Sequence, residues 1–299
     1  MHIPSSMMNG AVCPVTAAMS VGGVAIAAVM AWKTEEKPTA LRFAAVGAFV
    51  FAGQMANFPV HSGTSGHLLG GVLAAALLGV PFGVLAIALV VSLQCLVFAD
   101  GGISELGANI LNMAILGAGI GGWIFTKLTG PSTSRQLGAL GAASWFSVMM
   151  ASLACSVELA TADTIAFSKV APAMLSVHAL IGLGEAAMTV AAMAALHSTA
   201  IQPTDRRHGF FLVLSAGIIA LLVAPFACAW PDGLESVAGT LRFLHTSAPS
   251  FVAPFPNYTI HGVSNEMLAT SLAGGVGASL SFFAAWGIAR LWQKRSAIQ

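Results

Sequence analysis

Charged residues are scarce in this sequence. Asp, Glu, Lys and Arg together make up 8% of the 299 residues, whereas a soluble globular domain carries about 25%. Hydrophobic residues make up 57%, and the mean hydropathy is +0.85. These values exclude an ordinary water-soluble protein and predict a chain that lies in a lipid bilayer. The formal net charge of +1 provides no basic field for nucleic acid, so we expect no such partner.

Paired cysteines and an ATP-binding motif are also missing. The four cysteines show no Cys-x-x-Cys spacing, and we interpret them as small buried hydrophobic residues: Cys13, Cys95, Cys155 and Cys228. No segment matches the P-loop pattern Gly-x-x-x-x-Gly-Lys-Ser/Thr, so the chain is not expected to be an enzyme that hydrolyses ATP. The start, Met1-His2-Ile3-Pro4, lacks the basic segment of a cleaved signal peptide.

Long apolar runs occupy most of the chain. They lie near residues 14–32, 40–58, 66–80, 82–99, 107–128, 137–160, 172–199, 210–228 and 271–292. Because a helix needs about 20 residues to cross a bilayer, the pattern predicts an all-α, polytopic transmembrane helical bundle of about nine spans. The run at 66–80 is short, and Pro81 separates it from the next run, which favours a hairpin or a broken helix.

The few basic residues orient the bundle, because short cytoplasmic loops collect Lys and Arg. If the N-terminus lies outside, only Lys169 and Arg242 fall in outer loops. The basic residues that fall inside are Lys33, Lys37, Arg42, Lys127, Arg135, Arg206, Arg207, Arg290, Lys294 and Arg295. Acidic residues lean toward the outside: Asp100, Glu105, Glu158, Asp163, Asp232, Glu235 and Glu266. We therefore predict an odd number of spans, with the N-terminus outside and the C-terminus inside.

The loops divide the chain into two parts. Most connections are short, but a polar outer loop runs over residues 229–270, between the last two spans. The cytoplasmic stretch 202–207, Gln-Pro-Thr-Asp-Arg-Arg, precedes those two spans. The sequence thus predicts a seven-span body over residues 1–200 and an appended two-span unit over residues 201–299.

The first two residues form a chelating unit. The amine of Met1, the amide nitrogen of His2 and the imidazole of His2 can bind one ion through fused chelate rings. Nitrogen ligands in a tetragonal arrangement suit Ni(II) or Cu(II), and also Co(II). Three nitrogens leave one corner open. Near the outer face, His61 and His67 are the candidates for the fourth ligand, and His67 follows a Gly-rich turn that would fix its side chain.

Five motifs make the chain similar to a known family. They are the start Met-His-Ile-Pro, the run 58–71 (FPVHSGTSGHLLGG), the stretch 94–103 (QCLVFADGGI), the stretch 106–113 (LGANILNM) and the stretch 177–185 (VHALIGLGE). In this order they resemble the CbiM/NikM family, the substrate-binding (S) components of energy-coupling factor (ECF) transporters for cobalt and nickel. Residues 210–292, with Pro-Asp-Gly-Leu-Glu at 231–235, resemble the NikN/CbiN-type PDGLE partner.

This resemblance implies a permease subunit that imports Co(II) or Ni(II) across a bacterial or archaeal cytoplasmic membrane. Met1, His2 and His67 would bind the metal, which is cargo and not a permanently bound cofactor. A transmembrane coupling (T) subunit and cytoplasmic ATPase subunits would supply the energy. Two features depart from the family: Ser5-Ser6 replaces an acidic-Gly turn, and His61 stands where a small residue is expected, as an entrance relay or an accident.

Other polar residues have two interpretations each. Asn109 and Asn112 lie on one helix face, where Asn112 could orient a ligand imidazole or join helices by a hydrogen bond. His178 and Glu185 are seven residues apart and form a candidate intramembrane polar pair, with a coupling or a packing role. Ser65 is interpreted first as a residue that stabilises the Gly-rich turn.

A rival function starts from the same serine. Gly-Thr-Ser-Gly at 63–66 has the GxSG form of rhomboid-like intramembrane serine proteases, with Ser65 as nucleophile and His178 as base. The four-residue match is short, and the proposed base has no further supporting motif. Metal transport is therefore the first hypothesis and proteolysis the alternative.

Overall fold

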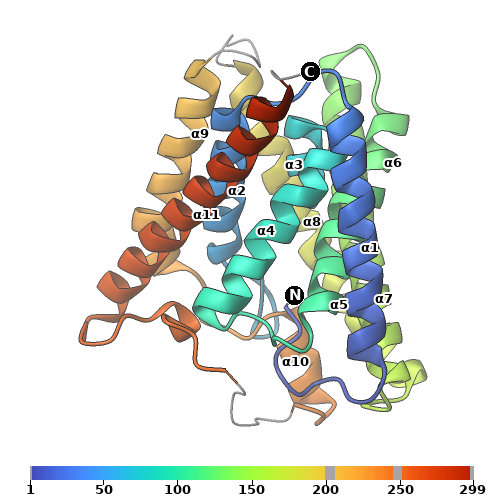
Figure 1. Ribbon diagram of the computed structural model, residues 1–299. Helices are drawn as coiled ribbons and strands as arrows, with labels where there is room; N and C mark the ends of the chain where they lie inside the picture. The colour runs from blue at the N-terminus through green and yellow to red at the C-terminus, as the bar shows by residue number, and fades with distance from the viewer. Residues whose placement is uncertain (1, 199–205, 245–250, 297–299) are drawn as a thin grey trace.

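The computed structural model describes residues 2–198, 206–244 and 251–296. Within these ranges the chain is a bundle of helices (Figure 1). Seven segments are long and apolar enough to cross a membrane. They are α1 (Val12–Lys33), α4 (Val80–Phe98), Leu106–Leu128, α7 (Thr133–Thr161), α8 (Phe167–Ser198), Arg207–Phe226 and α11 (Glu266–Ser296). The all-α polytopic fold is thus confirmed.

Two of the long segments change their helical pitch. Leu106–Leu128 consists of α5 (Leu106–Ile110), the π-helix η1 (Leu111–Ile120) and α6 (Gly121–Leu128). Arg207–Phe226 belongs to α9 (Arg206–Ile218), the short π-helix η2 (Ile219–Val223) and the 3-10 turn η3 (Ala224–Phe226). Inside α-helices, π-type turns often occur at functional sites. The first of these two segments carries Asn109 and Asn112.

Each of the nine predicted apolar runs contains a helix, but two of these helices are shorter than a full span. Helix α2 (Ala40–Met55) has 16 residues, and α3 (Gly71–Leu78) has eight and would rise only about 12 Å. The run predicted at 66–80 is therefore not one helix: a strand ends at Gly66, irregular backbone follows, and the helix begins only at Gly71. Gly70 (φ 73°) and Gly79 (φ 87°) bound α3 in conformations that L side chains avoid. The broken helix expected at Pro81 is thus present.

A β-hairpin follows α2, which ends at Met55, three residues before the predicted end of its span. Strand β1 (Phe58–His61) pairs antiparallel with β2 (Thr64–Gly66), and Phe58 faces Gly66 in the register. Ser62 (φ 49°) and Gly63 (φ 78°) form the two-residue turn, whose left-handed conformation matches the twist of a hairpin. The Gly-rich run thus encodes a turn that projects from the bundle.

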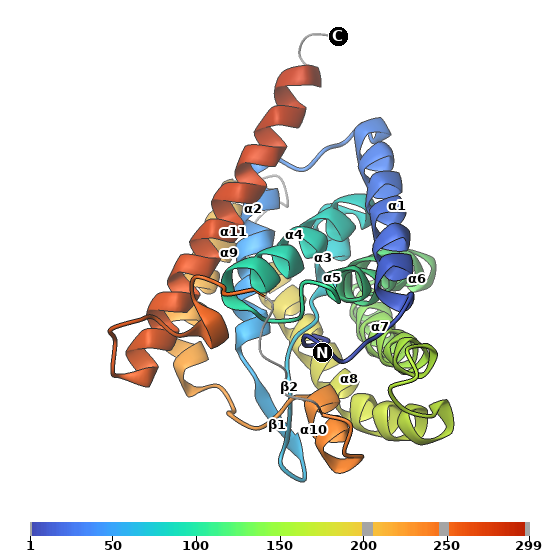
Figure 2. The ribbon, with the colours of Figure 1, turned by 60° about the horizontal axis from the view of Figure 1, so that its bottom comes forward.

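The last part of the chain wraps around α2. Helices α9 and α11 pack against α2, and 13 of its 16 residues are buried. Between them, the outer loop predicted at 229–270 contains the helix α10 (Gly233–Thr240) and the 3-10 turn η4 (Pro256–Tyr258). Figure 2 shows α10 beside the hairpin. Cys228 N–H donates to Asn57 O at 2.9 Å, and Ser65 N–H donates to Pro231 O at 2.9 Å.

The ends of the bundle separate the loops into two groups. The loop between α1 and α2 and the last turns of α11 lie at the upper end of Figure 1, whereas α10 lies at the lower end. The hairpin and the N-terminal segment belong to the face that Figure 2 brings forward. The structure therefore gathers His2, His67 and the outer loop of the appended unit at one end.

Candidate metal centre

The N-terminal segment folds back against the start of the α5 segment. Ile3 N–H donates to Asn109 Oδ1 at 2.7 Å, and Asn109 Nδ2 donates to Ile3 O at 3.2 Å. Gly102 N–H donates to the same carbonyl at 2.9 Å. Ile3 is fully buried, and His2 is 8% exposed. Asn109 thus holds the backbone next to His2 through two hydrogen bonds to Ile3.

The departure at Ser5-Ser6 has a structural explanation. Ser6 adopts a left-handed conformation (φ 73°), which a glycine would adopt without strain. Its N–H donates to Glu105 Oε1 at 2.9 Å. The acidic partner of this turn therefore comes from a distant residue, and Glu105 is fully buried.

His67 lies on a loop that two buried side chains hold. Glu185 accepts hydrogen bonds from Leu69 N–H at 2.6 Å and Gly70 N–H at 2.9 Å. Gln54 Nε2 donates to Leu69 O at 2.8 Å. His67 Nδ1 lies 3.0 Å from Leu68 O, which can only accept a hydrogen bond, so Nδ1 carries the proton. Nε2 is then the ring nitrogen that carries the lone pair.

The structure brings His2 and His67 together. Their rings are stacked, with centroids 5.5 Å apart and planes 15° apart. His2 Nε2 lies 3.1 Å from Gln94 Oε1, and His2 Nδ1 lies 3.2 Å from Asp100 Oδ1. Burial lowers the pKa of His67 to about 3 and also lowers the pKa of His2, because it disfavours the charged rings. Both imidazoles are therefore neutral near pH 7 and able to bind a metal.

Carboxylates lie close to the two imidazoles. Burial raises the pKa of Asp232, but nearby positive charge and a hydrogen bond from Glu235 N–H outweigh this effect and hold the pKa well below its usual range. Asp232 and Glu235 cap the first turn of α10 reciprocally. The Asp and Glu of the Pro-Asp-Gly-Leu-Glu run thus start a helix and place an ionised carboxylate near the candidate site.

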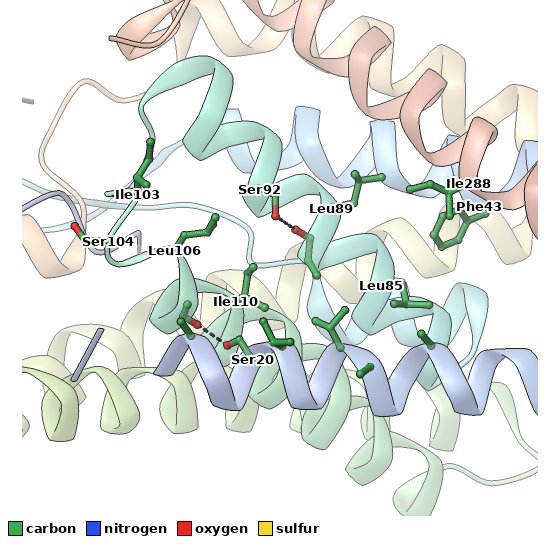
Figure 3. Close-up of a pocket in the computed structure, with 17 residues that line it drawn as sticks. Ser20, Phe43, Leu85, Leu89, Ser92, Ile103, Ser104, Leu106, Ile110 and Ile288 are labelled. Atoms are coloured by element: carbon green, nitrogen blue, oxygen red, sulfur yellow. Dashed lines mark hydrogen bonds between the residues drawn. The ribbon is translucent and has the colours of Figure 1, made fainter. Parts of the chain in front are cut away.

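A cavity of about 640 Å³ joins these groups. The body contributes His2, Gln54, His67 and Asp100 to its wall, and the appended unit contributes Asp232 and Tyr258. Another cavity of about 680 Å³ lies between α1, α4 and α5 (Figure 3). Its wall is apolar apart from hydroxyls such as those of Ser20 and Ser92, which donate to backbone carbonyls. The first cavity is therefore the one suited to a metal cation.

Several residues singled out in the sequence lie apart from this cavity. His61 is exposed on the hairpin. Asn112 Nδ2 donates to Glu158 Oε2 at 2.8 Å, so its partner is a carboxylate and not a ligand imidazole. His178 and Glu185 share no hydrogen bond: His178 Nδ1–H donates to Met174 O at 2.8 Å, whereas Glu185 holds the loop of His67. The two residues therefore do not form the expected intramembrane pair. They lie on one face of α8, but each forms hydrogen bonds with a different part of the backbone.

The protease alternative finds no support in this geometry. Ser65 Oγ–H donates to Trp230 O at 2.7 Å, and His178 donates to its own helix. Each side chain is thus engaged with a backbone carbonyl. Ser65 instead joins the hairpin to the outer loop of the appended unit.

Sequence reasoning missed four side chains at the candidate site: Gln54, Asp100 and Asp232 in the cavity wall, and Gln94 beside His2. Gln54, Gln94 and Asp100 follow no metal-ligand spacing, and their approach depends on how α2 and α4 end. Asp232 was noted only as an acid in a loop. Across the described ranges, no three residues among His, Cys, Asp and Glu form a ready metal cluster. Met1, the remaining predicted ligand, lies outside those ranges.

Known proteins place the chain in a family. Residues 2–204 match the family model described as cobalt uptake substrate-specific transmembrane region, and residues 206–294 match that of the PDGLE domain. A chain of Archaeoglobus fulgidus with the provisional name fused nickel transport protein NikMN is 32% identical over 288 residues, which are 93% of this chain and 94% of the relative. The fused nickel transport protein NikMN of Rhodobacter capsulatus is 28% identical over 74% of this chain and 61% of its own length.

Solved structures agree with these relatives. The crystal structure of a transition metal transporter has a TM-score of 0.59 and 27% identity, covering 70% of this chain and 97% of the other. The structure of a truncated transition metal transporter has a TM-score of 0.57 and 29% identity, covering 67% and 99%. The chain therefore belongs to the CbiM family of cobalt and nickel transport proteins, in the fused form that also carries a PDGLE domain.

Proposed function

We propose that this chain is the metal-binding S component of an ECF-type importer for Ni(II) or Co(II). The observation that carries the proposal is the stacked pair His2 and His67, buried in one cavity by the folded N-terminal segment. Relatives named as fused nickel transport proteins favour nickel as the cargo. The body would comprise residues 1–200, and the PDGLE unit residues 201–299.

The chelate uses four nitrogens in this proposal. Within His2, the amide nitrogen and Nδ1 close one ring around the metal, and the amine of Met1 closes a second. If His2 Nε2–H donates to Gln94, Nδ1 carries the lone pair that binds the cation. The nearby carboxylate of Asp100 attracts that cation electrostatically. His67 Nε2 would fill the fourth corner, which gives the near-planar set that Ni(II) accepts.

Transport requires energy from other subunits. Because the sequence has no P-loop, we propose that cytoplasmic ATPases and a T subunit reorient the loaded chain. The PDGLE unit would assist loading or release, since its residues Asp232 and Tyr258 share the cavity wall with His2 and His67. Truncation after residue 205 should then reduce metal uptake by cells, and full uptake by the truncated chain would exclude this role.

Metal binding by the purified full chain tests the chelate. Ni(II) titrated at neutral pH should bind with one ion per chain. His2→Ala, His67→Ala and a single extra residue before Met1 should each weaken binding at least about 100-fold, since each removes or displaces a ligand nitrogen. His61→Ala is the matched control, because His61 is exposed on the hairpin. Unchanged binding after the N-terminal extension would contradict the proposal.

The same titration has an expected pH dependence. The amine and the amide must lose protons to bind, so protons compete with the metal, and affinity should fall as the pH decreases from 7.5 to about 6. His67 does not set this range, because its pKa is already lowered to about 3. Equal affinity at both pH values would exclude a chelate built on the amine and amide.

A further inference from the structure

Tyr258 reaches from the appended unit to the body. It is the only tyrosine of the chain and lies in the outer loop before α11. Its ring is stacked on Phe98 at the end of α4, with centroids 4.7 Å apart and planes 17° apart. It also meets Phe51 edge-on at 6.3 Å. Aromatic packing thus fixes the ring on the outer ends of α2 and α4.

The hydroxyl of Tyr258 is linked to the candidate ligand His2 through Asp100. It donates to Asp100 Oδ2 at 2.6 Å, and the other oxygen of the same carboxylate, Oδ1, lies 3.2 Å from His2 Nδ1. A single carboxylate therefore joins a side chain of the appended unit to the nitrogen that the chelate requires. All three side chains line the same cavity.

The backbone around Tyr258 is held in an unusual conformation. Asn257 (φ 53°) and Tyr258 (φ 56°) are both left-handed, although neither is glycine. Such conformations persist when surrounding contacts determine them, and they concentrate at functional sites. Here Phe255 N–H donates to Val97 O at 2.9 Å and anchors the preceding residues on α4. The loop is therefore shaped to present the hydroxyl to Asp100.

We infer that Tyr258 is a positioning residue for metal loading: its hydroxyl holds Asp100, whose other oxygen lies beside the His2 nitrogen that the chelate uses, so that the carboxylate attracts the cation there. This inference rests on the proposed chelate and goes beyond it, because it assigns the PDGLE unit a direct path to one ligand. Groups that support a metal site without ligating the ion typically change the metal affinity about 10- to 100-fold when they are removed. A carboxylate without the hydroxyl is free to rotate away from Nδ1.

Tyr258→Phe tests the inference, because it keeps the ring stack on Phe98 and removes only the oxygen. The purified full-length variant should bind Ni(II) about 10- to 100-fold more weakly than the wild type. The visible absorption of bound Ni(II) should also shift, whereas the thermal melting temperature without metal should change little. Thr259→Val is the matched control, since this neighbouring hydroxyl donates only to Pro256 O at 2.7 Å.

A double-mutant cycle separates the relay from general packing. In the background Asp100→Asn, Tyr258→Phe should cause little further loss of Ni(II) affinity, because the carboxylate it orients is already gone. An equal loss in both backgrounds, or wild-type affinity and absorption in Tyr258→Phe, would overturn the inference while His2→Ala still abolishes binding. A wild-type chain that binds no Ni(II) would overturn the proposed function, and this inference with it.

Discussion

Glu185 shows how one side chain can fix a binding loop from a distance in sequence. Its two carboxylate oxygens accept from Leu69 and Gly70, and it is fully buried. Glu185 therefore fixes the backbone just after His67, and this positions His67 without a direct contact between the two side chains. In the sequence the same residue stood out only as an intramembrane acid.

Replacing Glu185 should loosen this loop. Glu185→Ala leaves two buried N–H groups unsatisfied, each at a cost of about 1–3 kcal/mol, so the melting temperature of the metal-free protein should fall. Ni(II) affinity should fall too, because His67 loses its support. Glu185→Gln keeps one acceptor oxygen and should be intermediate. Glu36→Ala, in the exposed loop between α1 and α2, is the control; an Ala variant at 185 that melts and binds like wild type would refute this role.

Helix α10 owes its position to a glycine. A Cβ at Gly233 would lie 2.7 Å from Ile181 Cδ1, 2.8 Å from His178 Cε1 and 3.0 Å from His178 Nε2. The first turn of α10 therefore rests directly on α8, where any larger residue would push it away. This close approach gives His178 a packing role.

Two glycines of the same helix allow a matched comparison. Gly233→Ala should destabilise the outer loop by about 1–3 kcal/mol through overpacking, whereas a Cβ at Gly239 meets nothing within 4 Å. Gly239→Ala should therefore be neutral or stabilise α10 by about 0.5–1 kcal/mol. Limited proteolysis of the outer loop and thermal melting measure both. Equal behaviour of the two variants would show that α10 does not depend on this contact.

At the level of elements, the sequence predicted the long helices well and the short ones poorly. Apolar runs of about 20 residues define α1, α4, α7 and α8 because the bilayer imposes that length. The end of strand β2 and helix α3 lie in one apolar run with Gly66, Gly70 and Gly71, where hydropathy cannot tell strand from helix. The left-handed φ of Gly70 and the hydrogen bonds of Glu185 settle that choice, and both depend on tertiary structure.

The candidate site divides in the same way. His2 and His67 were predicted because their chemistry and position are visible in the sequence. Asp100, Gln94 and Tyr258 were not, since each meets His2 or its partner only through the arrangement of α4 and the outer loop. Local spacing carries no information on such contacts.

At the scale of the whole molecule, the distribution of charge predicts which loops lie outside the membrane and which lie inside. In a cysteine-free variant, Ser62→Cys on the hairpin should react in intact cells with a maleimide that does not cross membranes. Glu35→Cys in the loop between α1 and α2 should react only after the membrane is permeabilised. Both native side chains are exposed, so accessibility within the protein is matched. The opposite labelling pattern would invert the predicted topology.

Because α9 and α11 pack around α2 in the same chain, the outer loop between them stays close to the body that it contacts. A separate two-helix partner would have to find the body by diffusion in the membrane, and its occupancy would depend on the amounts of both proteins. In one chain the encounter is intramolecular, with an effective concentration set by the connecting segment. The contact between Tyr258 and Asp100 should therefore stay formed at low expression, and every body carries its partner in a fixed one-to-one ratio.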